Sequence, residues 1–444
     1  MRRLAGLVVA AVIVPLAGLV ATGAVPGWPA AQAGPAGASP AVAASPAGSV
    51  AARPTPSSAP AGGPIASPSP SPSPAGAAPG PETRRVSDAA LEAALTAWVR
   101  RTGTPGASAA VLWPDGRLWL GVAGVADAAT KRPMTTDTAF AYASVTKTFT
   151  AAIIEQLIDE GRLGIDQAAA PLLPGEGLDP RITVRNLLDH TSGLPDFFRV
   201  TGIEPALNKN HRTVWTVEDS LAFGRKDRAA PDTFWRYSNT GYVYLGMIAE
   251  AVTGESWAEL VRTRLLDPLG LHETFIQGVE TPPVPLSQGH RVTGTGAASK
   301  ATPLAGPGDP MVPFTSVVTA SGSAGEIAGT AEDAARWAAD LYGGTIVSPA
   351  MIRAAIADVN RVDRFHPKIR YGLGVQLVKY GSHVTWGHSG TFIGFKEQIR
   401  WLPDLRIAVV LLTNQSRYET TAIERRLIDL AASRAGPTTC EACR

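Results

Sequence analysis

The sequence predicts an α+β fold, in which an antiparallel sheet built from both ends of the folded region is flanked by helices and carries an inserted helical region. Two observations predict it. Short apolar runs typical of strands occur at 107–113 and 118–125, and a second series of such runs lies near the C-terminal end. Between them, residues 181–310 hold helical patterns joined by long polar connections. This order favours helices packed against one sheet.

Residue spacing and turn residues justify the individual elements. A helix at 91–101 precedes the two first strands, which form a hairpin because Pro114, Asp115 and Gly116 make a turn between them. Further helices are expected at 184–189, 257–266, 332–342 and 422–432, and the C-terminal strands at 372–379, 384–388, 395–401 and 407–413.

The N-terminal residues have the pattern of a signal peptide. Two arginines near the start precede an apolar run over 4–25, and Ala31-Gln32-Ala33 is a small-residue cleavage site. We therefore expect a signal peptide at 1–33 and a secreted or extracytoplasmic protein that associates with the cell wall. An uncleaved membrane anchor is the alternative, and Pro15 within the run argues against it.

Three segments follow the expected signal peptide. Residues 34–85 are rich in Pro, Ala and Ser and predict a disordered linker, because such a composition buries too little apolar surface to fold. Residues 86–433 are expected to form one folded domain, and 434–444 a C-terminal tail. The tail holds the two cysteines of the sequence, Cys440 and Cys443, for which we expect a small disulfide or free thiols without a catalytic role.

Charge and motifs exclude several classes of function. The 40 Lys and Arg residues nearly balance the 38 Asp and Glu residues, which gives no indication of nucleic acid as a partner. The sequence has no phosphate-binding G-x-x-x-x-G-K motif, no strand-bound G-x-G-x-x-G and no cluster with metal-ligand spacing. We therefore expect no cofactor and no metal, and the sequence does not indicate an oligomeric state.

Ser144 and Lys147 form the first candidate catalytic pair. The residues from 144 to 158 carry an apolar stripe with helical spacing, and Gly161 lies where the helix should end. Side chains three apart share one face of a helix, and the first turn favours negative charge. A lysine kept partly dry beside such a serine can act as a base. The alternative is an ordinary N-cap serine and a solvated lysine.

Two downstream motifs favour the catalytic interpretation. Tyr237-Ser238-Asn239 and the stretch 386–391 follow S-x-x-K in an order that resembles the serine β-lactamase and penicillin-binding protein family. The tyrosine and histidine forms are most similar to class C β-lactamases and the related D-alanyl-D-alanine carboxypeptidases. Residues 182–194 and 371–374 add to the resemblance, which covers about 86–433. It implies a β-lactamase/transpeptidase-like α+β fold.

The resemblance implies a role for each motif residue. Ser144 attacks the substrate carbonyl, and Lys147 takes or shares its proton. Tyr237, as phenol or phenolate, passes a proton to the leaving nitrogen and then activates water; Lys147 is the cation expected to lower its pKa. Asn239 binds Lys147 and the substrate amide. His388 orients Tyr237 or donates to the substrate.

The resemblance also implies which residues bind the substrate, most of them in the stretch 386–391. The oxyanion is expected to bind backbone N–H groups of Ser144 and Thr391. The residues that the resemblance assigns to substrate binding are Ser389, Gly390, Thr391 and Gln376.

The alternative interpretation of these motifs is that residue 237 is an ordinary loop tyrosine and residue 388 a structural histidine. A nucleophile elbow at 387–391 fails, because G-x-S-x-G needs glycine where Thr391 stands. His190 is better explained as part of a turn that closes the helix at 184–189.

We therefore expect an exported serine acyl-hydrolase with D-alanyl-D-alanine carboxypeptidase-like activity on peptidoglycan peptides. An esterase or a β-lactamase is the alternative enzyme, and a non-catalytic penicillin-sensing or wall-binding protein is the alternative of another class. In all cases the partner is a small molecule or peptide. The family pattern has arginine where Gln376 stands, so we expect weak carboxypeptidase activity and readier hydrolysis of uncharged short-chain esters.

Overall fold

The computed structural model describes residues 83–224, 228–306, 309–357, 360–361 and 369–435. The expected signal peptide, nearly all of the expected linker, and both cysteines lie outside these residues. No helix in the described ranges has the length and apolar character that crossing a membrane requires.

The expected sheet is confirmed, and both ends of the folded region contribute to it. Within the described residues it has ten strands in the order β1-β3-β2-β15-β14-β13-β12-β11-β10, with β4 beside β3. All neighbours are antiparallel except β1 and β3. The strands are β1 (Arg84–Arg85), β2 (Gly106–Leu112), β3 (Arg117–Asp127), β4 (Arg132–Pro133), β10 (Asn360–Arg361), β11 (Ile369–Tyr371), β12 (Gln376–Tyr380), β13 (His383–Phe392), β14 (Phe395–Leu402) and β15 (Ile407–Thr413).

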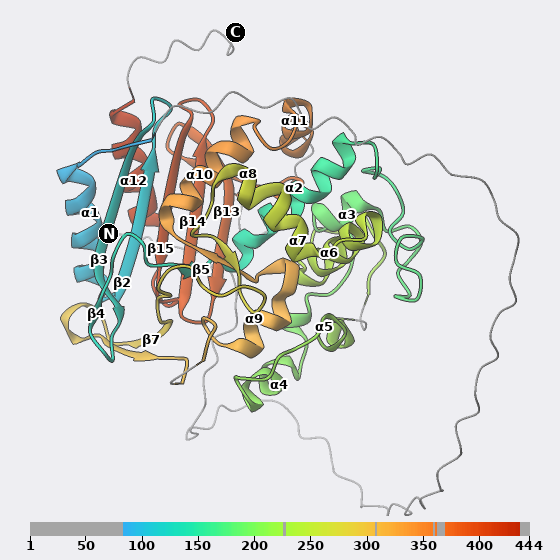
Figure 1. The fold of residues 1–444 in the computed structure, drawn as a ribbon, viewed down its shortest axis with the longest axis horizontal. Helices are drawn as coiled ribbons and strands as arrows, with labels where there is room; N and C mark the ends of the chain where they lie inside the picture. The colour runs from blue at the N-terminus through green and yellow to red at the C-terminus, as the bar shows by residue number, and fades with distance from the viewer. Residues whose placement is uncertain (1–82, 225–227, 307–308, 358–359, 362–368, 436–444) are drawn as a thin grey trace, which may run out of the picture. The chain divides into compact units, whose positions relative to one another are not determined.

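Helices cover both faces of this sheet (Figure 1). On one face α1 (Ala89–Thr102) and α12 (Thr421–Ser433) pack on Val409 and Leu411 of β15. On the other face α10 (Ala331–Gly343) packs on Val410 and its alternating neighbours. Because successive strand residues point to opposite faces, burial of both faces makes β15 apolar throughout.

The inserted region between strands β4 and β10 is mainly helical, as expected. Its elements are η1 (Ala143–Val145), α2 (Thr146–Asp159), α3 (Val184–Leu188), η2 (Phe197–Arg199), α4 (Ile203–Lys209), α5 (Val217–Gly224), α6 (Asn239–Thr253), α7 (Trp257–Val261), the π turn η3 (Arg262–Leu266), α8 (Asp267–Leu269), η4 (Gly296–Ala298), α9 (Thr315–Ser321), η5 (Gly322–Ala324), α10 and α11 (Pro349–Ala357). It also holds two small sheets of short strands, β5 (Phe140–Ala141) with β9 (Ile327–Gly329) and β6 (Phe275–Ile276), and β7 (His290–Thr293) with β8 (Lys300–Pro303).

Two expected strands differ from those observed. The strand expected at 372–379 is interrupted, because β11 ends at Tyr371 and β12 begins only at Gln376. Gly374 between them has φ 70°, and a side chain there would meet Ala151 on α2. The strand expected at 384–388 continues to Phe392, because its pairing with β14 extends to that residue.

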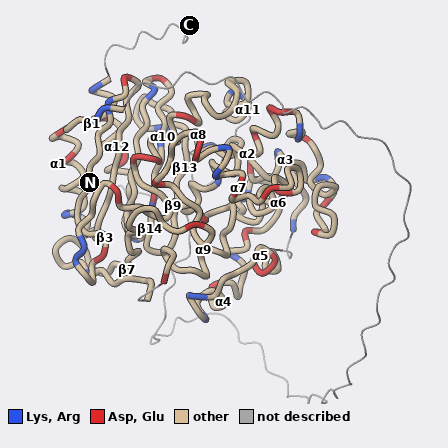
Figure 2. Tube along the Cα trace, in the orientation of Figure 1, with Lys and Arg blue, Asp and Glu red and all other residues tan. Residues whose placement is uncertain are grey.

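Charged residues of both signs are interspersed along the described trace (Figure 2), in agreement with the balanced composition.

Candidate active site

Ser144 lies at the point where the helical region meets the sheet. It sits in the 3-10 turn η1, one step before α2, rather than in the first α-helical turn that the sequence predicts. Every other residue from 138 to 155 is buried, whereas Ser144 is partly exposed. A substrate can therefore reach this hydroxyl but not its neighbours.

The backbone around Ser144 is tightly held. Ala143 has φ 48°, a left-handed conformation that is uncommon for residues other than glycine and is often found at functional sites. Strand β13 approaches this turn closely at Gly390, where an added Cβ would lie 2.3 Å from the Tyr142 carbonyl oxygen. Glycine at 390 thus brings β13 against the turn that carries the nucleophile.

Lys147 is fully buried one turn after Ser144. Its Nζ donates to Ser144 Oγ at 3.2 Å, to Asn239 Oδ1 at 2.6 Å and to the Ala324 carbonyl oxygen at 2.8 Å. Burial lowers the pKa of Lys147 to about 7, against the raising effect of the Asp196 carboxylate. A substantial neutral fraction at neutral pH makes this amine a suitable general base.

Tyr237 lies in the loop before α6, and its ring is close to Lys147. The Lys147 ammonium is 5.0 Å from the centre of the Tyr237 ring. Burial raises the pKa of Tyr237 well above its ordinary value, although the Ser144 hydroxyl acts to lower it. Tyr237 is therefore a phenol in the free protein, and the phenolate alternative is not favoured.

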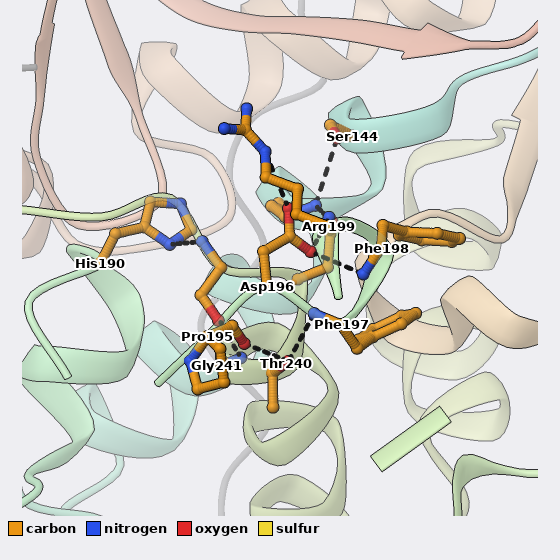
Figure 3. A network of polar contacts seen from close by, with 12 residues as sticks. Ser144, His190, Pro195, Asp196, Phe197, Phe198, Arg199, Thr240 and Gly241 are labelled. Atoms are coloured by element: carbon orange, nitrogen blue, oxygen red, sulfur yellow. Dashed lines mark hydrogen bonds and ion pairs between the residues drawn. The ribbon is translucent and has the colours of Figure 1, made fainter. Parts of the chain in front are cut away.

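Asn239 begins α6 and connects Lys147 to an acidic residue that the sequence analysis did not single out. Its Nδ2 donates to Asp196 Oδ1 at 2.9 Å, while its Oδ1 accepts from Lys147. Asp196 is 6% exposed and also accepts from the Phe198 N–H at 3.2 Å. Figure 3 shows this network, with the half-exposed Arg199 side chain beside Asp196, its Nε 3.6 Å from Asp196 Oδ2.

His388 is buried on β13 and does not hydrogen-bond Tyr237 as expected. Its Nδ1 is 2.7 Å from the Ser389 carbonyl oxygen and its Nε2 is 2.9 Å from the Tyr371 hydroxyl. A carbonyl oxygen can only accept, so Nδ1 carries the proton and the Tyr371 hydroxyl donates to Nε2. Burial lowers the pKa of His388 to about 3, so its imidazole is neutral.

His190 forms the turn that the sequence analysis expected after α3. It has φ 66°, and its Nδ1 accepts from the Ser238 N–H at 3.2 Å. Its ring lies 4.4 Å from the Tyr237 ring and 4.6 Å from the Tyr371 ring. His190 therefore packs against both tyrosine rings and helps to fix the position of Tyr237.

Gln376 and Ser389, both expected to bind substrate, contact each other. Gln376 Oε1 accepts from the Ser389 N–H and Oγ–H, each at 3.1 Å, and from Arg400 Nη1 at 3.3 Å. Arg400 was not expected in this place. It is buried and paired with Glu424 at 2.8 Å.

The strand register explains how Arg400 reaches Gln376. Gln376 on β12 pairs with Gly387 on β13, and Gly387 pairs with Arg400 on β14. The three residues therefore form one row across three strands, and the missing side chain at Gly387 lets the two outer side chains meet. Thr391 lies further along β13, beyond the start of β12, where its Oγ1 donates to the Gly390 carbonyl oxygen.

Within the described ranges, no group of three or more His, Cys, Asp or Glu residues is arranged to hold a metal ion. Hydrogen bonds connect Lys147 to Ser144 and Asn239, and the Tyr237 ring lies beside the Lys147 ammonium.

Comparison with known proteins agrees with this arrangement. A family model described as β-lactamase matches residues 89–433. Penicillin-binding protein 4 of Amycolatopsis lactamdurans is 31% identical over 70% of this chain and 81% of its own length. Esterase EstB of Burkholderia gladioli is 30% identical over 42% of this chain and 50% of its own length.

Solved structures show the same fold. A D-stereospecific amidohydrolase from Streptomyces sp. has a TM-score of 0.64 at 28% identity and covers 76% of this chain and 96% of its own. A D-amino acid amidase from Ochrobactrum anthropi SV3 has a TM-score of 0.66 at 27% identity and covers 78% of this chain and 99% of its own. The family match spans the sheet, the helical region and all three motifs, and the chain belongs to the β-lactamase family of serine hydrolases.

Proposed function

We propose that the protein forms an acyl-enzyme on Ser144 and hydrolyses amide bonds next to D-configured residues. The observation that carries the proposal is the Lys147 amine, which contacts both Ser144 Oγ and Asn239 Oδ1 in a buried setting. A neutral amine at this point takes the Ser144 proton while Oγ bonds to the substrate carbonyl carbon.

Collapse of the tetrahedral adduct then releases the leaving amine. The Tyr237 hydroxyl donates a proton to the leaving nitrogen and regains one from the Lys147 ammonium, so the amine departs neutral and Lys147 is again a base. In the deacylation step, water gives a proton to Lys147 and Tyr237 while it attacks the ester carbonyl carbon. The same residues then return the proton to Ser144 Oγ as the carboxylic acid is released. Backbone N–H groups of Ser144 and Thr391 bind the oxyanion in both steps.

The substrate class is proposed from the relatives and from Gln376. The matched structures include a D-stereospecific amidohydrolase and a D-amino acid amidase, and the matched relatives include penicillin-binding proteins. We place this protein among exported D-peptide hydrolases with D-alanyl-D-alanine carboxypeptidase-like chemistry. Because Gln376 offers no charge to a terminal carboxylate, amidated D-peptides should be better substrates than free acids.

A second candidate is an esterase. Gln376 in place of a cation favours uncharged short-chain esters, and an esterase is among the relatives that match part of the chain.

Covalent labelling tests the proposal. A fluorescent penicillin or a fluorophosphonate should label Ser144, as located by mass spectrometry, and Ser144→Ala should remove the label without loss of fold. Turnover of paired D- and L-alanyl amides, of a D-Ala-D-Ala peptide and of p-nitrophenyl butyrate then assigns the class. Label on another serine, or preference for the L-amide, contradicts the proposal.

A further inference from the structure

A hydrogen-bonded chain through Asn239 links the acidic side chain of Asp196 to the catalytic amine. Lys147 Nζ to Asn239 Oδ1 measures 2.6 Å, and Asn239 Nδ2 to Asp196 Oδ1 measures 2.9 Å. The amide of Asn239 lies between a cation and an anion, and each fixes one of its ends. With the carboxylate on the nitrogen side, the amide oxygen must face Lys147.

We propose that Asp196 is a positioning residue for the reaction: its charge orients the Asn239 amide and sets the protonation of the Lys147 base. The inference rests on the proposed acyl transfer at Ser144. It adds a residue that lies outside the three sequence motifs, in the turn after α3.

Hydrogen-bond donors and cations face the Asp196 carboxyl group and favour its charged form. Burial raises the pKa of Asp196 overall, against the opposing effects of the Asn239 amide, the Arg199 guanidinium, the Lys147 ammonium and the Phe198 N–H. In the opposite direction, Asp196 is the group that raises the pKa of Lys147 against the effect of burial. The amine and the carboxylate therefore regulate each other across one amide.

A purely structural role makes a different prediction. Asp196 also caps η2 through the Phe198 N–H, and Asn is as good a cap as Asp. An Asn at 196 keeps the cap and an oxygen for Asn239, and removes only the charge. The substitution Asp196→Asn therefore separates the two roles.

The size of the effect follows from the spacing. The two hydrogen bonds and the width of one amide put the opposite charges roughly 7–8 Å apart, so with an effective dielectric constant of about 20 the carboxylate raises the Lys147 pKa by roughly 1.5–1.7 units. Without it, a larger fraction of the amine is neutral at lower pH.

The experiment measures the rate of Ser144 labelling by a fluorophosphonate as a function of pH in the full chain. We expect the acid limb of the profile to move down by roughly 1.5 pH units in Asp196→Asn. The maximal rate should fall, because a neutral amide oxygen at 196 holds the Asn239 amide less strongly than the carboxylate does. Asp196→Glu, which keeps the charge, should return the limb towards its native position. Asp179→Asn, which removes a surface carboxylate paired with Arg181, is the matched control and should leave the profile unchanged.

Each outcome is decisive. An acid limb that stays in place in Asp196→Asn overturns the inference while labelling of the native chain upholds the proposed function. Failure of Asp196→Asn to fold, with Asp196→Glu folded, also overturns it, because the carboxylate then serves the fold. Absence of Ser144 labelling in the native chain overturns the proposed function and the inference with it.

Discussion

Replacing Glu397 with methionine should stabilise the protein. Glu397 lies on β14 opposite Gly390, is 0% exposed, and neither of its carboxyl oxygens has a hydrogen-bond partner among the described residues. A buried polar group without a partner costs about 1–3 kcal/mol. Methionine fills similar space without that cost. Glu397→Met should therefore raise the free energy of unfolding by about this amount even where the carboxyl is neutral.

The gain should grow with pH. Burial raises the pKa of Glu397 well above its ordinary value of 4.5, although the Lys396 ammonium acts to lower it. Lys396 is itself paired with Glu419 at 2.9 Å. Above pH 4.5 the unfolded carboxyl loses its proton while the folded one keeps it, so the native state binds more protons and loses stability as pH rises. For a single proton this loss cannot exceed about 1.4 kcal/mol per pH unit.

Urea unfolding of native and Glu397→Met chains at pH 5, 6 and 7 measures both effects. The difference in the free energy of unfolding should be positive at pH 5 and increase at each step. Glu255→Met, at an exposed position, is the control and should show no such trend. A variant less stable than the native chain, or a difference independent of pH, would refute the account of a buried neutral carboxyl.

Three further predictions concern the site. The acid limb of kcat/KM should have an apparent pKa near 7, because the Lys147 pKa is about 7 and the amine must be neutral; a limb near pH 4 to 5 contradicts this. Tyr237→Phe and Lys147→Met should each lower kcat roughly 10²–10⁴-fold in steady-state kinetics. The double variant should lower kcat little further, because the two side chains act together in proton transfer. Gly390→Ala should abolish Ser144 labelling, because its Cβ would lie 2.3 Å from the Tyr142 carbonyl oxygen, whereas Gly306→Ala, in open space, should retain it.

Local patterns in the sequence were sufficient to predict the sheet and the Ser144–Lys147 pair. Apolar patterning and turn residues placed the hairpin at 107–125 and the strands at 395–401 and 407–413 close to their observed bounds. The S-x-x-K spacing likewise brought Ser144 and Lys147 together, since three residues along a helix or 3-10 turn return to the same side.

What the sequence did not reveal depends on contacts between distant segments. Asp196 lies 43 positions before Asn239 and meets it only after α3 and α6 pack. Helix α6 is buried on most sides, so it lacks the polar face by which an amphipathic helix is identified. The partner of His388 is Tyr371 rather than Tyr237, and it is selected by the pairing of strands and not by any local spacing.

Contacts between distant segments also change the expected effect of replacing Gln376. The sequence suggests that Gln376→Arg restores a cation for a terminal carboxylate. The strand row shows that a cation is already there, since Arg400 reaches Gln376 across Gly387 and is neutralised by Glu424. A second guanidinium at about 4 Å would be opposed by roughly 4 kcal/mol at an effective dielectric constant of about 20. Gln376→Arg alone should therefore destabilise the protein and gain little peptidase activity.

The double variant Gln376→Arg/Arg400→Gln keeps one cation for Glu424 and moves it towards the site, so it should raise kcat/KM for a D-Ala-D-Ala peptide relative to p-nitrophenyl butyrate. A gain in the single variant equal to that in the double variant would show that Arg400 does not control the charge at this position.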